Sequence, residues 1–171
     1  MYLRITKDFP GIEDDGERYV IRRLFTYFGA VYVNLDKPLW IEGKVVIQGD
    51  LTSNVPVVSE GSIILYGVIR APAVGSGNNI AARGLSIKGD VFAEGDVKVG
   101  NVGLACENLK AFQVYAMDED GFVSCSGKLT ASLIVSDNVS AGEIEGLIRH
   151  EDVAIITARE YKRLMNGGDY R

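Results

Sequence analysis

The feature of the sequence that most restricts its fold is a six-residue period in its aliphatic side chains. Counting from Val45 in steps of six reaches Leu51, Val57, Ile63 and Ile69. Four residues after each of these positions stands a small or modest side chain: Gly49, Val55, Gly61, Gly67 and Ala73. A helix repeats every 3.6 residues and a strand every 2, so neither produces a period of six. The period therefore predicts short strands separated by tight corners.

Three such strands with their corners close a triangle of about eighteen residues, and the strands of successive coils then pair in parallel about 4.8 Å apart. No coil buries its apolar face alone, so the coils stabilise one another as repeats do. Over residues 43–147 the period predicts an all-β, single-domain parallel β-helix, a three-sided solenoid of about six coils. The sequence leaves its handedness open.

The period lapses over residues 71–84 and again over residues 116–127. Glycines and asparagines in the first lapse are typical of loops, and both lapses are interpreted as loops outside the regular body. The period resumes at Leu85, Val91 and Val97, and later at Leu133 and Val139. These positions are predicted to point into the core.

The segments before and after the repetitive part differ from it in composition and pattern. Residues 1–42 form an aromatic-rich segment that we expect to cap one end of the solenoid. Within it, residues 14–29 suggest an amphipathic helix with a stripe of Val20, Leu24, Tyr27 and Phe28, placed between two short strands. Residues 148–171 are predicted to form a strand and a short helix, because Thr157 and Glu160 make a capping-box pair. This helix is the expected cap of the other end.

Charge and composition narrow the classes of function. The 171 residues carry a formal net charge of −5 and the sequence pI is about 4.9, which disfavours a broad nucleic-acid-binding face. Residues 1–19 contain no apolar signal-peptide core, and no apolar stretch approaches twenty residues. We expect a cytoplasmic protein that binds no nucleic acid.

Three Gly-Asp-aliphatic units recur in the repetitive part, in "VVIQGDL" and "LSIKGDVFAEGDVKVGNV". They are Gly49-Asp50-Leu51, Gly89-Asp90-Val91 and Gly95-Asp96-Val97. This pattern resembles the bactofilins, bacterial cytoskeletal proteins with a right-handed parallel β-helix core. The resemblance implies end-to-end self-assembly into nonpolar filaments without nucleotide, with membrane-associated or cell-envelope partners. The folded-looking flanks depart from that family, and covered ends would limit assembly to a small oligomer.

Candidate catalytic and metal-binding residues are few. His150, beside Glu151 and Asp152, is the sole histidine and the one candidate base for a hexapeptide-type acyltransferase. Asp118, Glu119 and Asp120, with Asp50, Asp90 and Asp96, offer oxygen ligands for calcium, although an acidic triplet is also typical of a solvated loop. We expect no catalytic residue, no cofactor and no metal site.

Other conspicuous residues also have two interpretations. Tyr66, Phe92, Phe112 and Phe122 either line a glycan-binding face or pack under loops. Cys106 and Cys125 lie nineteen residues apart, about one coil, and are expected to be free buried thiols. The Gly75-Ser76-Gly77 segment lacks the rest of a dinucleotide fingerprint and is interpreted as loop.

The sequence therefore favours a noncatalytic structural or scaffold protein that self-associates through its β-helix into an oligomer or filament. Two alternatives stay open. One is a solenoid module that binds a glycan or a protein partner, and the other is an acyltransferase that uses His150.

Overall fold

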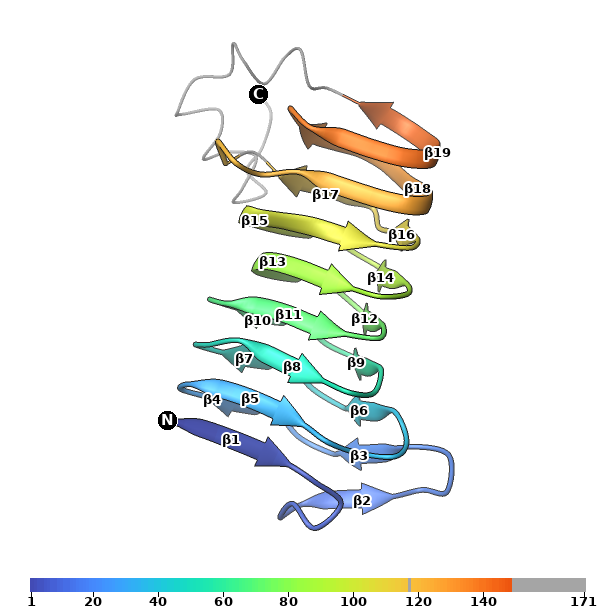
Figure 1. Cartoon of the computed structure of the whole chain (residues 1–171). Coiled ribbons are helices and arrows are strands. Elements are labelled where there is room, and N and C mark those ends of the chain that lie inside the picture. The colour runs from blue at the N-terminus through green and yellow to red at the C-terminus, as the bar shows by residue number, and fades with distance from the viewer. Residues whose placement is uncertain (117, 149–171) are drawn as a thin grey trace, which may run out of the picture.

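The computed structural model describes residues 1–116 and 118–148 as a rod of short strands wound around one core (Figure 1). All regular elements of these residues are strands, so this part of the chain has no helix that could span a membrane. The strands stack into a parallel β-solenoid of about seven turns. The predicted all-β, single-domain parallel β-helix is confirmed.

The strands form three faces, and apart from β2 every described strand pairs in parallel with a strand of a neighbouring coil. Face 1 contains β1 (Tyr2–Ile5), β5 (Ala30–Val33), β8 (Leu51–Ser53) and β11 (Val68–Ala71). Face 2 contains β3 (Tyr19–Ile21), β6 (Leu39–Ile41), β9 (Val57–Ser59), β12 (Val74–Ser76), β14 (Val91–Ala93) and β16 (Leu109–Lys110). Face 3 contains β4 (Phe25–Tyr27), β7 (Val45–Ile47), β10 (Ile63–Leu65) and β17 (Gln113–Ala116).

Four longer strands bend around corners and so belong to more than one face. They are β13 (Ile80–Ile87), β15 (Val97–Cys106), β18 (Val123–Ser136) and β19 (Val139–Ile148). A single strand, β2 (Ile12–Asp14), runs antiparallel to its neighbour, which is β3. It forms the outer edge of face 2 at the N-terminal end of the rod.

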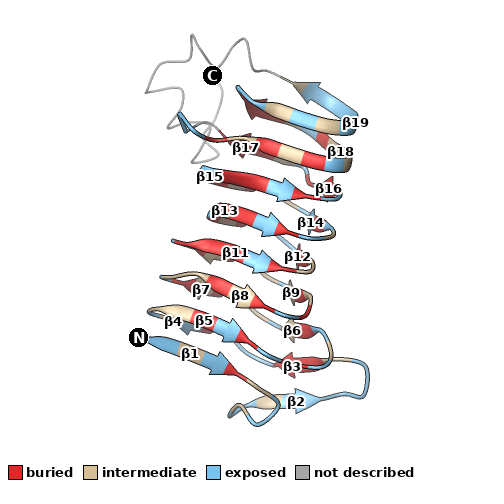
Figure 2. Ribbon diagram, in the orientation of Figure 1, coloured by how far each residue is buried: buried red, intermediate tan, exposed pale blue. Residues whose placement is uncertain are grey.

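The core is a stack of aliphatic side chains from all three faces (Figure 2). In a three-residue strand such as β7, the first and third residues are buried and the middle one points outward. Val91 and Val97 are 1% and 0% exposed, as the period predicted. Ser59 and Ser76 also point inward, and their hydroxyls donate to the carbonyl oxygens of Gly43 and Gly61 in the preceding coil. Their burial therefore leaves no unpaired polar group.

Corner glycines allow successive coils to approach closely. A Cβ added to Gly49 would lie 2.5 Å from the carbonyl carbon of Gly29, one coil earlier. A Cβ added to Gly67 would lie 2.5 Å from the carbonyl oxygen of Gly49. Neither residue has a positive φ, so close approach of the backbones, not left-handed conformation, explains these glycines.

The predicted helix over residues 14–29 is wrong. Residues of this segment form β3 and β4, which pair in parallel with β6 and β7 and so belong to the solenoid itself. Leu24 and Phe28, expected on the apolar stripe, are 57% and 66% exposed. Asp15 caps a turn, since its carboxylate accepts hydrogen bonds from the amides of Glu17 and Arg18. The short strands predicted on either side are present as β1 and β5.

The loop predicted over residues 71–84 is also wrong, because β12 and the first five residues of β13 lie there. The coil is short: Val57 pairs with Val74, seventeen residues later, and Ile69 pairs with Leu85, sixteen residues later. Because these coils are one or two residues shorter than eighteen, the core positions no longer fall at multiples of six and the period cannot be seen in the sequence. The second predicted loop is shorter than expected, because β18 begins at Val123.

Leu133 is off register by one residue. Ile134 is the buried residue of this part of β18, whereas Leu133 is half-buried at the corner. The predicted strand and helix over residues 148–171 lie outside the described residues, apart from Ile148 at the end of β19. That part of the prediction stays a prediction.

Candidate functional site: a groove on face 2

The candidate catalytic group of an acyltransferase, His150 with Glu151 and Asp152, lies outside the described residues. The structure therefore does not bear on this hypothesis. It does locate the other residues singled out by the sequence.

The six candidate calcium ligands are not brought together. Asp50, Asp90 and Asp96 precede β8, β14 and β15, which lie at three different corners of the triangle. Asp118, Glu119 and Asp120 lie in an exposed turn between β17 and β18. Among the described residues, no three acidic, histidine or cysteine side chains are grouped as a metal site requires.

Corner aspartates and asparagines instead link neighbouring coils. Asp50 Oδ1 accepts a hydrogen bond of 2.9 Å from the amide of Val68, and Asp50 Oδ2 lies 3.0 Å from Arg70 Nη1. Asn79 makes the same kind of bond to the amide of Asp96, at 2.8 Å. In each pair the side chain satisfies a backbone donor of the next coil. These residues are therefore structural links.

The environment of Asp50 makes this link sensitive to pH. The amide of Val68, followed by the guanidinium of Arg70, lowers the pKa of Asp50 below its ordinary value of 3.8, although burial opposes the shift. Because this pKa is lower in the folded state, the ionised Asp50 carboxylate stabilises the fold, and this stabilisation is complete above the unfolded-state pKa. It is lost as the pH falls through the folded-state pKa.

We expect Asp50→Asn to cost about 1 kcal/mol or less at neutral pH, because the amide oxygen keeps an acceptor for Val68 and the lost ion pair is half-exposed. The difference in unfolding free energy between the wild type and this variant should begin to shrink as the pH falls below the ordinary pKa of Asp50, and it should vanish below the lowered folded-state pKa. Chemical unfolding at several pH values measures it. A difference that does not change with pH would mean that the carboxylate charge adds nothing to the link.

The two cysteines form a buried thiol pair. Cys106 and Cys125 are register partners on adjacent coils, and their Sγ atoms are 3.5 Å apart. Both are free, as predicted. The hydrogen bond to Cys125 and burial raise the pKa of Cys106 well above its ordinary value. Cys106 is therefore an unreactive thiol in the core.

The four aromatic residues considered for a glycan-binding face do not form one platform. Tyr66 follows β10, Phe112 follows β16, Phe122 precedes β18, and Phe92 is the middle residue of β14. Tyr66 and Phe122 lie at the same corner but three coils apart, and Phe92 and Phe112 lie on another face and at another corner. Of the four, Phe92 alone lines the groove described next.

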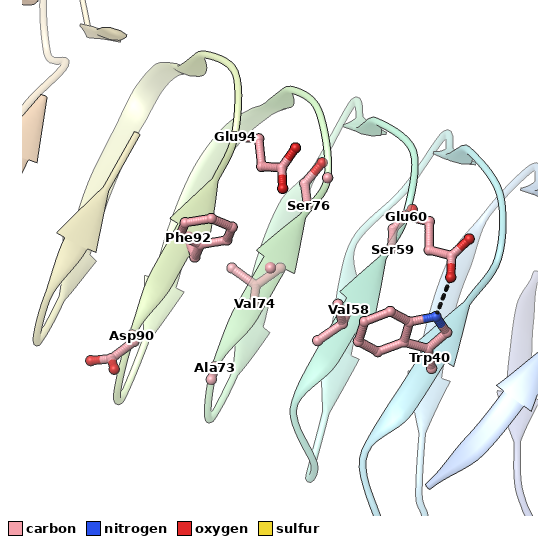
Figure 3. A pocket seen from close by; sticks show the side chains of 12 residues that line it. Trp40, Val58, Ser59, Glu60, Ala73, Val74, Ser76, Asp90, Phe92 and Glu94 are labelled. Atoms are coloured by element: carbon pink, nitrogen blue, oxygen red, sulfur yellow. Dashed lines mark hydrogen bonds between the residues drawn. The ribbon is translucent and has the colours of Figure 1, made fainter. Parts of the chain in front are cut away.

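A groove of about 600 Å³ lies on the outer surface of face 2 (Figure 3). Its floor is one row of register partners: Trp40 pairs with Val58, Val58 with Gly75, and Gly75 with Phe92. Trp40 and Phe92 stand at the two ends of the row that lines the groove (Figure 3). Gly75 lies between Val58 and Phe92 in this row and has no side chain to fill the space above it. We call this the face 2 groove.

Gly75 has no backbone reason to be glycine. A Cβ built on it would meet the Cγ atoms of Val58 at 3.6 Å, an ordinary contact distance. Its φ is not positive. Gly77, two residues later, is different, because a Cβ there would clash with the carbonyl oxygen of Glu60. The groove therefore exists because of a residue that the fold does not require.

The polar groups around the groove are mostly acceptors. Glu60 and Glu94 lie on one side of the groove, and Asp90 lies on the other (Figure 3). The lining contains these three carboxylates and neither lysine nor arginine. The indole of Trp40 donates to Glu60 Oε1 at 3.0 Å. The groove therefore combines an apolar floor with a negatively charged rim.

Neighbouring residues hold the groove in shape. Arg18 covers the ring of Trp40, with its Cζ atom 4.0 Å from the ring centroid, and also pairs with Asp15. Asn108 donates to Asp90 Oδ1 at 2.9 Å. The tryptophan and one carboxylate are thus fixed before any ligand arrives.

The sequence did not reveal this site. Trp40 and Phe92 are fifty-two residues apart and become neighbours of one row because the intervening coils contain eighteen, seventeen and seventeen residues. A constant period of eighteen would place Glu94 in that row and Phe92 two residues out of it. Once the coil lengths are known, Gly75 can be placed in the row between Trp40 and Phe92, where a missing side chain indicates a depression.

Comparisons of the chain with models of protein families, with curated proteins and with solved structures found no match. The arguments about function therefore rest on the chain's own geometry.

Proposed function

We propose that this chain is a noncatalytic structural protein that associates with a second copy through the C-terminal end of its β-helix. The observation that carries the proposal is a difference between the two ends of the solenoid. The first end is closed by its own residues, and the core side of β19 is exposed.

The N-terminal end is closed in two ways. Phe9 packs on Phe25, with ring centroids 6.5 Å apart, and Ile5 and Phe25 are both buried. The antiparallel strand β2 interrupts the parallel stacking, and its Glu13 and Asp14 form ion pairs with Arg22 and Lys37. A short, charged and antiparallel edge strand disfavours addition of another coil.

The exposed side of β19 has the opposite character. Ile144 occupies a core position, in register with the fully buried Leu129, yet it is 37% exposed. Val139, Ala141 and Ile148 are only half-buried. The visible ribbon of β19 is accordingly pale blue and tan in Figure 2. Among the described residues β19 pairs with β18 alone, so an edge of backbone donors and acceptors accompanies this apolar surface. A second copy would pair with the backbone groups of this edge and bury its apolar side chains.

An assembly with one closed end stops at two copies. Contact between two β19 edges is isologous, so it uses the same surface twice and leaves both closed ends outside. The resemblance to bactofilins implies filaments, and we propose a closed dimer in their place.

We expect light scattering on a size-exclusion column to give twice the 18.6 kDa chain mass at high concentration, with dissociation on dilution. Ile144→Glu should weaken the dimer at least tenfold, about 1.4 kcal/mol, because it places a charge in the apolar contact. Leu24→Glu is the matched control, since Leu24 is an exposed aliphatic residue of the first coils.

Three results would contradict the proposal. The wild type could be monomeric at every concentration, the two variants could behave alike, or negative-stain microscopy could show filaments. Filaments would mean that β2 does not close the first end.

A further inference from the structure

We propose that the face 2 groove binds a linear aliphatic polyamine, with its methylene chain over Gly75 and its ammonium groups at the carboxylates on the two sides. This proposal goes beyond self-association and does not depend on it, because the groove lies on the coils from β6 to β14 and not at β19.

The size and shape of the groove suit a small ligand. A volume of about 600 Å³ is within the usual range for small-molecule sites. Trp40 and Phe92 are three strand steps apart, roughly 14 Å at about 4.8 Å a step, and they bound the groove along the rod. The space over Gly75 lies between Val58 and Phe92, which are two strand steps apart, and it admits an alkyl chain lying on the sheet.

The charges define what the ends of the ligand must be. Glu94 and Asp90 flank the same strand, β14, and four residues of extended chain span roughly 13 Å. A ligand with a positive group at each end of an apolar chain can meet both carboxylates while its middle covers the floor. Each carboxylate has several acceptor sites, so Asp90 can bind a ligand and keep its bond from Asn108.

The hydrogen-bonding groups disfavour a sugar. A sugar hydroxyl both donates and accepts hydrogen bonds, and the side-chain donors around the groove that its oxygen could accept from are already used. Trp40 donates to Glu60, while Ser59 and Ser76 turn inward and donate to backbone carbonyls. Carboxylate acceptors beside an aromatic ring select an ammonium donor.

Isothermal titration calorimetry with spermidine tests the proposal. We expect one spermidine to bind per chain, with affinity that falls as salt is added, since the contacts are charged and partly exposed. A monoamine of the same chain length should bind at least tenfold more weakly, and a neutral diol should not bind.

Two variants and a control locate the site. Gly75→Leu fills the depression and should weaken spermidine binding at least tenfold without unfolding the protein, because a Cβ fits at this position. Glu94→Gln removes one charge and should have a similar effect. Glu119→Gln removes an exposed charge between β17 and β18, on another edge of the solenoid, and should change nothing.

Any of four results with small ligands would overturn the proposal. They are absence of spermidine binding, equal binding to Gly75→Leu, full competition by Mg²⁺ at matched charge, and binding of a neutral oligosaccharide at the same residues. Binding of a lysine-containing peptide in place of spermidine would also overturn it and would indicate a protein partner.

Discussion

Replacing Val91 by aspartate is expected to unfold the β-helix, whereas the same replacement at the next residue, Phe92, is expected to leave it folded. Val91 is 1% exposed and points into the core, while Phe92 is 42% exposed and points outward. An unpaired charge in the core costs about 3–5 kcal/mol or more, comparable with the whole stability of many domains. The measurement is circular dichroism of both variants during thermal unfolding.

The Phe92→Asp variant is the internal control, because it places the same side chain on the same strand one residue away. Successive side chains of a strand point to opposite faces, so a register error would exchange the two results. Equal tolerance of both substitutions would show that the in-out-in pattern of the strands is wrong. Equal unfolding would show that face 2 is covered on its outer side.

The six-residue period predicted the architecture because each strand of the regular coils supplies its core residues at fixed positions. It failed where two physical signals overlapped. Tyr19, Phe25 and Val31 follow the same period and are all buried, but the segment also carries a stripe with helical spacing. Pairing with β6 and β7 decides between the two patterns, and a single sequence does not contain that information.

Variable coil length limited the prediction elsewhere. Leu39 follows Val31 after eight residues, two more than the period, and the coil from Ile69 to Leu85 lacks two residues of eighteen. A corner tolerates such changes, because only the strands must stay in register. Leu85, Val91 and Val97 were assigned correctly because the period was counted afresh from Leu85. Leu133 was assigned with an error of one residue, because Val97 pairs with Val114 after seventeen residues and Val114 pairs with Ile134 after twenty.

The face 2 groove illustrates why sites on a solenoid are hard to predict from sequence. Its aromatic residues come from different coils, and its selectivity depends on which donors are already used. Trp40 and Ser76 look like available donors in the sequence, and the structure shows both engaged. The visible signal in the sequence is the Gly75-Ser76-Gly77 segment. Gly77 is required because a Cβ would clash with the carbonyl oxygen of Glu60, whereas a Cβ at Gly75 would fit.

The second large effect is expected at Gly67, a corner glycine where neighbouring coils approach closely. Gly67→Ala is expected to destabilise the protein by about 2–3 kcal/mol, because the new Cβ would clash with the carboxylate of Asp50 and lie 2.5 Å from the carbonyl oxygen of Gly49. The coils would have to separate at this corner, which would also strain the bond between Asp50 and the amide of Val68. The expected fall in Tm is roughly 5–10 °C.

Gly75→Ala provides the opposite case on the same solenoid. Its Cβ would make ordinary contacts with Val58, and alanine loses less conformational entropy than glycine in a strand. We expect a neutral effect or a gain of up to about 1 kcal/mol. Differential scanning calorimetry of both variants separates the two cases. A loss of stability at Gly75 as large as that at Gly67 would give this glycine a structural role, and the groove would then be a consequence of the fold and not a feature maintained for a ligand.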